Sequence, residues 1–186
     1  MDPQTLRLLD RLLDLSNSWA LHQSHANIHL GSIANISSQR RDTLSFSLPS
    51  PQTPQLLSAF PTLLPRLALK QSRALETAHE ALAASCAQLT RTVAAMSALR
   101  RDAFSKAGKA GMDGVAIEAA GWIDVVVGGY EREMRVREEL MCLLEEGVGE
   151  VEGVRVRWAR QGWVDFEVEE EVRERVKLAR AAEKRR

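Results

Sequence analysis

Three of the four histidines lie in one stretch, SWALHQSHANIHLGSIANI, and could bind a metal or act in acid–base chemistry. His22, His25 and His29 stand at i, i+3 and i+7, a spacing that puts side chains on one face of a helix. A zinc site needs about four ligands, or three and an open position in an enzyme. This stretch has no cysteine, and the nearest acids are Asp14 and Asp42. We therefore expect no metal, and we expect His22 and His29 to be polar seam positions at a helix interface, where such residues fix register or partner.

No other segment has the spacing of a catalytic or cofactor motif. The sequence contains no phosphate-binding loop, no glycine-rich dinucleotide fingerprint and no nucleophile elbow. The glycines of GKAGMDG come in the wrong order for a phosphate loop, and the acids of EVEEEVRERV repeat along one charged helix face. Paired acid–base carboxylates would instead need an enclosed cleft that separates their pKa values. We expect neither enzymatic activity nor a cofactor.

The N-terminal region, residues 1–38, is predicted to be a long helix with a heptad seam. Apolar residues alternate at spacings of three and four, which is typical of a coiled-coil helix. Asp2 before Pro3 is a suitable start, because aspartate caps a helix and proline fits its first turn. The predicted seam positions are Leu8, Leu12, Leu15, Trp19, His22, Ala26, His29, Ile33 and Ile36.

Residues 39–66 are predicted to be a Pro/Ser-rich linker, since they hold five of the six prolines. Proline removes a hydrogen-bond donor and disfavours helical geometry in the residue before it. Ser50 and Thr53 each precede a proline, the minimal pattern for proline-directed phosphorylation. A phosphate there would create a site for arginine side chains.

Residues 67–186 are predicted to be a helical bundle that starts with a second heptad helix, to about residue 106. Its seam residues are Leu75, Leu82, Leu89 and Met96. A further helix is expected at about 115–146, with the charged run EREMRVREE as a solvated stripe and Gly128-Gly129 as a kink or close contact. Beyond residue 151 we expect a helical turn, a break at QGW and a basic C-terminal helix capped by Asp165.

Composition favours a protein built of helices packed along seams, because Ala, Leu, Val, Arg and Glu dominate. The formal net charge is zero, which argues against a dedicated nucleic-acid binder, and no apolar run reaches the roughly 18 residues of a membrane span. Cys86 and Cys142 are expected to be reduced core thiols. We expect a nuclear or cytoplasmic protein with no membrane contact and no direct binding to nucleic acid. The fold class that follows is all-α: an elongated helical bundle or coiled-coil hairpin with a Pro-rich linker.

Three short motifs resemble the cyclin-dependent-kinase-interacting protein family, CINP. The first is Trp19 followed fourteen residues later by IANI, beginning at Ile33. The second is YEREMRVRE from Tyr130, which has the form Y-x-[RK]-E-[LM]. The third is WARQGWV, with Trp158, Gln161 and Trp163, which is similar to W-x-x-Q-[PG]-[YW]-V. In the third motif Gly162 stands where many family members have proline. The basic C-terminal helix lies outside the resemblance.

The resemblance implies a non-enzymatic helical adaptor. Family members are linked to cell-cycle kinases and DNA replication, and they join AAA-type ATPases and a small coiled-coil protein in ribosome maturation and protein turnover at chromatin. The expected partners are therefore such an ATPase, such a coiled-coil protein and a cyclin-dependent kinase. Two alternatives stay open: a structural coiled-coil subunit of a kinetochore or vesicle-tethering complex, and a metal- or nucleic-acid-binding protein. The expected interface residues are Trp19, His22, His29, Ile33, Leu75, Leu82, Leu89, Met96, Tyr130, Trp158, Gln161 and Trp163.

Overall fold

The computed structural model describes residues 1–46, 60–109, 114–147 and 150–185, and these residues form an all-α protein. The predicted fold class is confirmed at this level, because the described residues contain helices and no strand. The helices are α1 (Pro3–Phe46), α3 (Leu63–Lys109), α4 (Gly114–Glu145), α5 (Val151–Ala159) and α6 (Phe166–Glu183).

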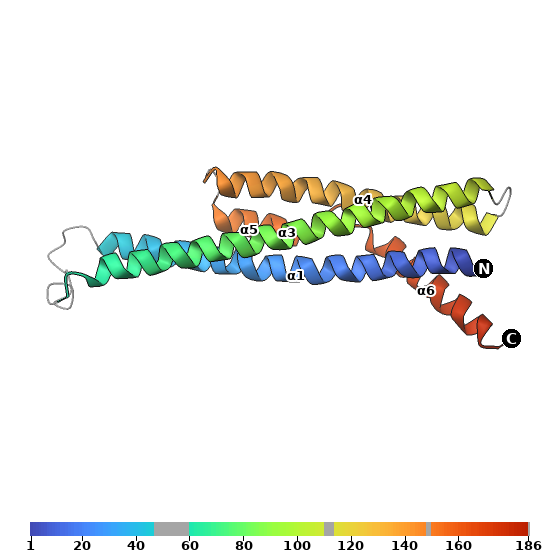
Figure 1. The fold of residues 1–186 in the computed structure, drawn as a ribbon, viewed down its shortest axis with the longest axis horizontal. Helices are drawn as coiled ribbons and strands as arrows, with labels where there is room; N and C mark the ends of the chain where they lie inside the picture. The colour runs from blue at the N-terminus through green and yellow to red at the C-terminus, as the bar shows by residue number, and fades with distance from the viewer. Residues whose placement is uncertain (47–59, 110–113, 148–149, 186) are drawn as a thin grey trace.

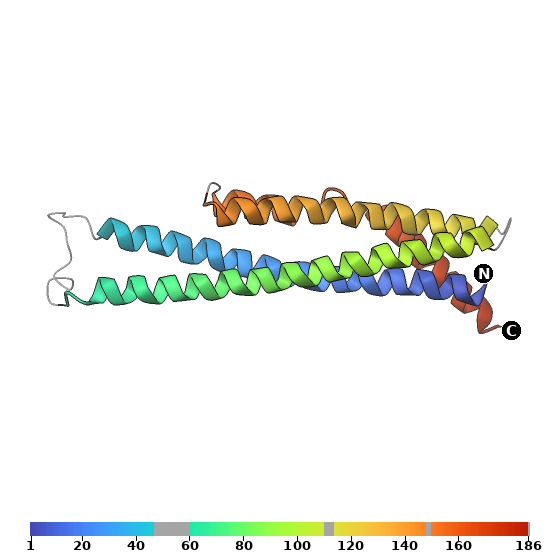
Figure 2. The ribbon, with the colours of Figure 1, turned by 45° about the horizontal axis from the view of Figure 1, so that its top comes forward.

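The two longest helices, α1 and α3, form an antiparallel hairpin that sets the length of the molecule (Figure 1). At 1.5 Å per residue, the 44 residues of α1 span about 66 Å. Helix α4 returns along α3, and α5 lies beside α4 (Figures 1 and 2). Helix α6 then crosses towards the N-terminal part of α1, so that both chain termini lie at the same end of the bundle.

The seam of α1 has the predicted 3–4 alternation, but at four of the nine predicted positions the side chain is only half-buried and the next residue is the buried one. Leu12, Trp19, Ala26 and Ile33 are buried as expected. At the alternate positions the buried side chain comes one residue later than predicted. These buried residues are Leu9, Ser16, Gln23 and Leu30, in place of Leu8, Leu15, His22 and His29. The physical reason is that Ser16 and Gln23 find polar partners inside the bundle, so their burial leaves no hydrogen bond unmade.

The seam of α3 agrees more closely with its heptad. Leu82, Leu89 and Met96 are fully buried, and Leu75 is half-buried near the free end of the hairpin. Ser85 and Thr92 occupy the alternate positions, and their hydroxyls donate to the carbonyls of Ala81 and Gln88 one turn earlier. Short polar side chains are therefore tolerated in this seam.

Both hairpin helices extend further into the predicted linker than expected. Helix α1 continues to Phe46 because no proline interrupts residues 39–46. Helix α3 starts at Leu63 and accepts Pro65 in its first turn, where a missing N–H costs no intrahelical bond. Ser50 and Thr53 lie outside the described residues.

The C-terminal elements follow the expected order. Residues 151–159 form a helical segment, as expected. The Asp165 side chain caps α6 by accepting from the Val168 N–H at 3.1 Å. The Asp2 carboxylate likewise accepts from the Thr5 N–H at the start of α1. Both cysteines are free, but Cys142 is exposed and so is not the core thiol that was predicted.

Candidate functional site

The most elaborate site in the described residues is a buried junction around Arg137 of α4. This side chain is completely buried. Its guanidinium lies 5.0 Å from the ring centroid of Trp19 on α1 and 5.2 Å from that of Trp158 on α5. Cation–π contacts of this kind contribute about 2 kcal/mol when they are shielded from water. Arg137 therefore holds three helices together.

The charge of Arg137 is neutralised one helical turn away by buried Glu133. The remaining donors are also used: Nε and Nη2 donate to Gln23 Oε1 at 3.0 and 2.8 Å, and Nη2 also donates to the Trp158 carbonyl at 3.3 Å. Burial lowers the pKa of Arg137, and the bond to Glu133 opposes that shift. A buried ion pair is tolerated only when such bonds satisfy both groups. The predicted solvated stripe EREMRVREE was therefore wrong at these two positions.

The second oxygen of Glu133 holds the loop between α5 and α6. Its Oε2 accepts from the Trp163 N–H at 3.1 Å. Gln161, in the same loop, accepts from the Trp19 indole N–H at 3.0 Å and has a φ of 40°. A non-glycine residue in this left-handed region costs about 1–2 kcal/mol, so the surrounding bonds must impose the conformation.

Gly129 of α4 allows this loop to approach the helix closely. A Cβ built on Gly129 would lie 2.6 Å from the Trp163 carbonyl oxygen, which is closer than atoms can pack. The neighbouring Gly128 has nothing within 4 Å of such a Cβ. The expected close contact at the glycine pair is thus made by Gly129 alone, with a loop as the partner.

A second buried group attaches α6 to the same junction. Glu169 Oε1 accepts from the Tyr130 hydroxyl at 2.5 Å and from the Ser16 hydroxyl at 3.2 Å. The Tyr130 ring meets the Trp19 ring edge to face at 5.0 Å. Burial raises the pKa of Glu169, and it also raises the pKa of Tyr130, with the Glu169 charge adding to that effect. The first turns of α6 are thereby fixed to α1 and α4.

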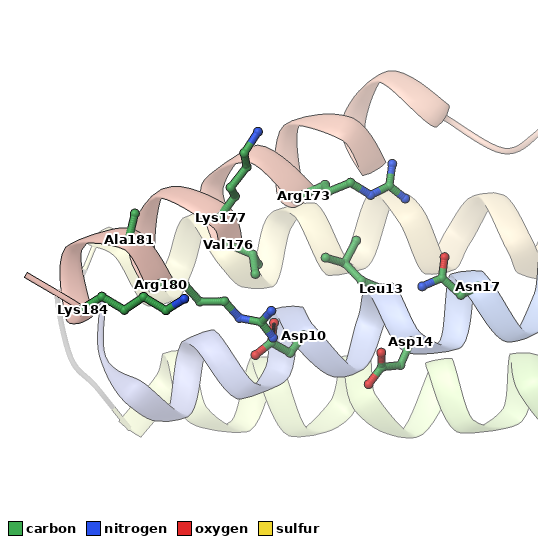
Figure 3. Close-up of a pocket in the computed structure, with 10 residues that line it drawn as sticks. All are labelled: Asp10, Leu13, Asp14, Asn17, Arg173, Val176, Lys177, Arg180, Ala181 and Lys184. Atoms are coloured by element: carbon green, nitrogen blue, oxygen red, sulfur yellow. Dashed lines mark hydrogen bonds and ion pairs between the residues drawn. The ribbon is translucent and has the colours of Figure 1, made fainter.

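Beyond Glu169, α1 and α6 border a groove of 520 Å³ (Figure 3). Leu13 and Val176 face each other at its floor (Figure 3). The α1 wall carries Asp10 and Asp14, and the Asp10 carboxylate accepts from Arg180 of α6 at 2.8 Å. The remaining cations of the groove are Arg173, Lys177 and Lys184. The ion pair between Asp10 and Arg180 therefore joins α1 and α6 across this groove.

The structure brings together one subset of the predicted interface residues. Trp19, Tyr130, Trp158, Gln161 and Trp163 all meet at the Arg137 junction. Within this chain the first three are at most 2% exposed, so they are internal, while Trp163 is 54% exposed and stacks under the guanidinium of Arg132.

The other predicted residues lie along the hairpin. Those buried in the α1–α3 seam are Ile33, Leu82, Leu89 and Met96. His22 and His29 are half-buried on the flank of α1, and the His22 ring lies 6.5 Å from that of exposed His25. The described residues hold no cluster of three or more His, Cys, Asp or Glu side chains placed to bind a metal.

The sequence reasoning missed five members of the junction: Ser16, Gln23, Glu133, Arg137 and Glu169. Two signals were present. Ser16 and Gln23 stand seven residues apart on an otherwise apolar helix face, and Glu133 precedes Arg137 by one turn directly after Tyr130. Polar residues at helical spacing beside aromatic residues were read as solvated when they in fact form a paired internal network.

In comparisons with protein-family models, curated proteins and solved structures, nothing matches this chain. Among the helices that the structure describes, none combines the length and apolarity needed to cross a lipid bilayer.

Proposed function

We propose that this protein is a non-enzymatic helical adaptor subunit of a multiprotein assembly, similar to CINP-type subunits. Such subunits work with AAA-type ATPases in ribosome maturation and in protein turnover linked to chromatin and replication, and with cell-cycle kinases. The proposal includes nuclear or cytoplasmic action and a small coiled-coil protein as second partner. The identity of the partners is inferred from the motif resemblance. The way in which the protein docks on them is inferred from the junction around Arg137.

The observation that carries the proposal is the fixed and exposed Trp163. Its loop is bonded through Glu133 and Gln161 and fits against Gly129, yet the indole is 54% exposed. Tryptophan and arginine are the side chains most enriched among interface hot spots, and Trp163 is paired with Arg132. A rigid loop that presents such a pair loses little entropy on binding, which is the property expected of a docking point.

A second candidate function is a structural coiled-coil subunit of a kinetochore or vesicle-tethering complex. The observation that favours it is the α1–α3 hairpin, whose free end extends past α4 (Figures 1 and 2). A hairpin whose helices rise about 1.5 Å per residue could hold partners at its two ends far apart. The two functions differ in the partners they require, so one experiment separates them.

The experiment is affinity purification of the tagged chain from its own cells, with mass spectrometry of the bound proteins. Trp163→Ala removes the exposed indole and leaves the backbone N–H that Glu133 accepts. Leu178→Ala is the matched control, because Leu178 is 64% exposed on α6. We expect an AAA-type ATPase and a small coiled-coil protein with wild type and with Leu178→Ala, and at least about thirtyfold weaker binding with Trp163→Ala, the effect of one hot spot.

Recovery of kinetochore or tethering subunits instead would contradict the adaptor proposal and favour the second candidate. Equal recovery of the ATPase with both variants would leave the adaptor function standing and remove Trp163 from its interface. Trp158→Ala is unsuitable here because Trp158 is fully buried, and its loss would disturb the fold itself.

A further inference from the structure

The free end of the hairpin carries a concentration of exposed apolar side chains. We call residues 40–46 of α1 and 60–77 around the start of α3 the hairpin tip. Helix α4 ends before this part of the hairpin (Figures 1 and 2). Five large apolar side chains of the tip are at least 39% exposed: Leu44, Phe60, Leu63, Leu67 and Leu69. Large exposed apolar patches mark interaction sites, whereas single exposed apolar residues are ordinary surface, so the grouping of five in the tip is the informative observation.

The tip is also basic, although the whole chain has a net charge of zero. Its cations are Arg40, Arg41, Arg66, Lys70 and Arg73. Its acids are Asp42 and Glu76, which leaves an excess of three positive charges (five minus two). Arg41 shares a hollow with Glu150 and Glu152 at the start of α5, so its charge is partly balanced within the chain. On the α3 side of the tip, Glu76 follows Arg73 by three residues, whereas Arg66 and Lys70 have no acid within four residues along the chain.

Three of these cations and two of the leucines share one side of α3. Arg66, Lys70 and Arg73 stand at i, i+4 and i+7, and Leu63 and Leu67 stand one turn apart beside them. All five side chains are exposed. We call these five residues the α3 stripe. None of its cations forms an ion pair with a described residue, whereas α6 pairs its own cations with acids one turn away or across the groove.

We propose that the α3 stripe is a docking surface for an acidic amphipathic helix of a partner protein. The apolar side of that helix would cover Leu63 and Leu67, and its carboxylates would pair with Arg66, Lys70 and Arg73. A helix fits because acids placed three and four residues apart repeat at the same spacing as the cations. Charge complementarity of this kind chiefly sets partner choice and association rate. This inference deepens the proposed adaptor function, on which it rests, by naming the chemistry of one partner segment.

Two other occupants fit the stripe less well. The chain segment 47–59 contains no Asp or Glu, so unless Ser50 or Thr53 is phosphorylated it cannot neutralise the three cations. A membrane surface would attract the cations, but two leucines give too little apolar area for stable anchoring, which needs a broad apolar face. The experiment therefore includes both as outcomes that would overturn the proposal.

The first test measures binding of the full chain to a fluorescent 21-residue probe peptide by anisotropy. The probe carries leucine at its heptad a and d positions and glutamate at most other positions, and the control peptide replaces each glutamate by lysine. We expect binding of the acidic probe only, weakening as salt is raised. Vesicles of phosphatidylserine and phosphatidylcholine provide the membrane arm. Vesicle binding that competes with the probe would overturn the proposal, as would binding of neither peptide or equal binding of both.

The matched variants reverse two charges each on the same helix. Arg66→Glu with Lys70→Glu changes the stripe, and Arg91→Glu with Arg101→Glu changes two exposed cations elsewhere on α3. We expect the stripe variant to bind the probe about tenfold more weakly and the control variant to bind within about twofold of wild type. Circular dichroism checks that both variants keep their helices. An equal loss in both variants would show a long-range charge effect and overturn the proposed site.

The second test places a photo-crosslinking amino acid at Leu67 in the full chain in its own cells, with Leu178 as the control position. Mass spectrometry then maps the crosslinked peptide. A partner peptide with net negative charge and apolar residues at 3–4 spacing supports the proposal. Crosslinks to residues 47–59, to a second copy of this chain or to a basic segment overturn it.

If the ATPase is recovered equally with wild type and with the stripe variant, the stripe fails and the adaptor function stands. If the crosslinked peptide is an acidic helix of a tethering or kinetochore subunit, the α3 stripe stands as a docking surface and the adaptor function fails.

Discussion

Gly128 and Gly129 offer a matched test of the junction, because they are adjacent in α4 and differ in what an added methyl group would meet. Each change to alanine gains about 1 kcal/mol of helix propensity. The Gly128 methyl meets open space, so Gly128→Ala should stabilise the protein by about that amount. The Gly129 methyl would lie 2.6 Å from the Trp163 carbonyl oxygen and 3.5 Å from the Val164 Cα. Both atoms belong to the backbone of a loop that other hydrogen bonds already fix. The added methyl group would therefore force α4 and the loop apart.

Overpacking of this kind costs about 1–3 kcal/mol. Because the propensity gain is common to both variants, the difference between their free energies of unfolding isolates this cost. We expect Gly129→Ala to be about 1–3 kcal/mol less stable than Gly128→Ala. For a chain of this length each kcal/mol corresponds to about 2–4 °C in Tm. Urea unfolding followed by circular dichroism measures the difference. Equal or greater stability of Gly129→Ala would refute the close approach of the loop to α4.

Three further predictions concern buried charge and helix capping. Arg137→Met should lower the free energy of unfolding by about 3–5 kcal/mol because Glu133 is left buried and unpaired, and adding Glu133→Gln should recover part of the loss in the same urea titration. Burial raises the pKa of the Glu169 carboxyl in the folded protein, so ionisation of this group opposes folding. The free energy of unfolding is therefore highest below the pKa of this carboxyl in the unfolded chain, and it falls as pH rises from there to the raised pKa of the folded protein. Glu169→Gln should therefore gain stability relative to wild type as pH rises above the pKa of the unfolded carboxyl, and a difference that stays constant with pH would contradict that cause. Asp165→Ala removes the cap that accepts from Val168 and should cost about 1 kcal/mol, seen as faster amide hydrogen exchange at the start of α6 with unchanged exchange in α3.

The long helices were predictable because their seams repeat. Leu12, Trp19 and Ile33 gave the period of α1, and the leucines of α3 gave its heptad. Periodicity alone does not decide between adjacent residues at a seam. Leu8 and Leu9 are equally apolar, and Leu15 looks better suited to burial than Ser16 does when partners are unknown. The choice depends on Glu169, which is 153 residues from Ser16 in the chain.

The junction itself was beyond sequence reasoning for the same reason. Arg137 is exposed on any helical wheel that treats charge as a sign of solvent. Its burial requires Gln23, which is 114 residues away, and two indole rings from other helices. The aromatic residues that meet there were expected at a partner interface. Within this chain Trp19 and Trp158 enclose the buried Arg137 cation.

The distance along the chain between the two sides of the junction also has a consequence for synthesis. Trp19 and Gln161 are 142 residues apart, so at 5–20 residues per second about 7–30 s pass between their production. During that time α1 and α3 can already form a hairpin, and Tyr130 and Arg137 are made before Gln161, so the bond from the Trp19 indole to Gln161 is the last of the Trp19 contacts to form. Trp163 takes its fixed position only after its loop has reached Glu133 and Trp19. The position of the exposed indole, and not its exposure alone, therefore depends on the completed junction.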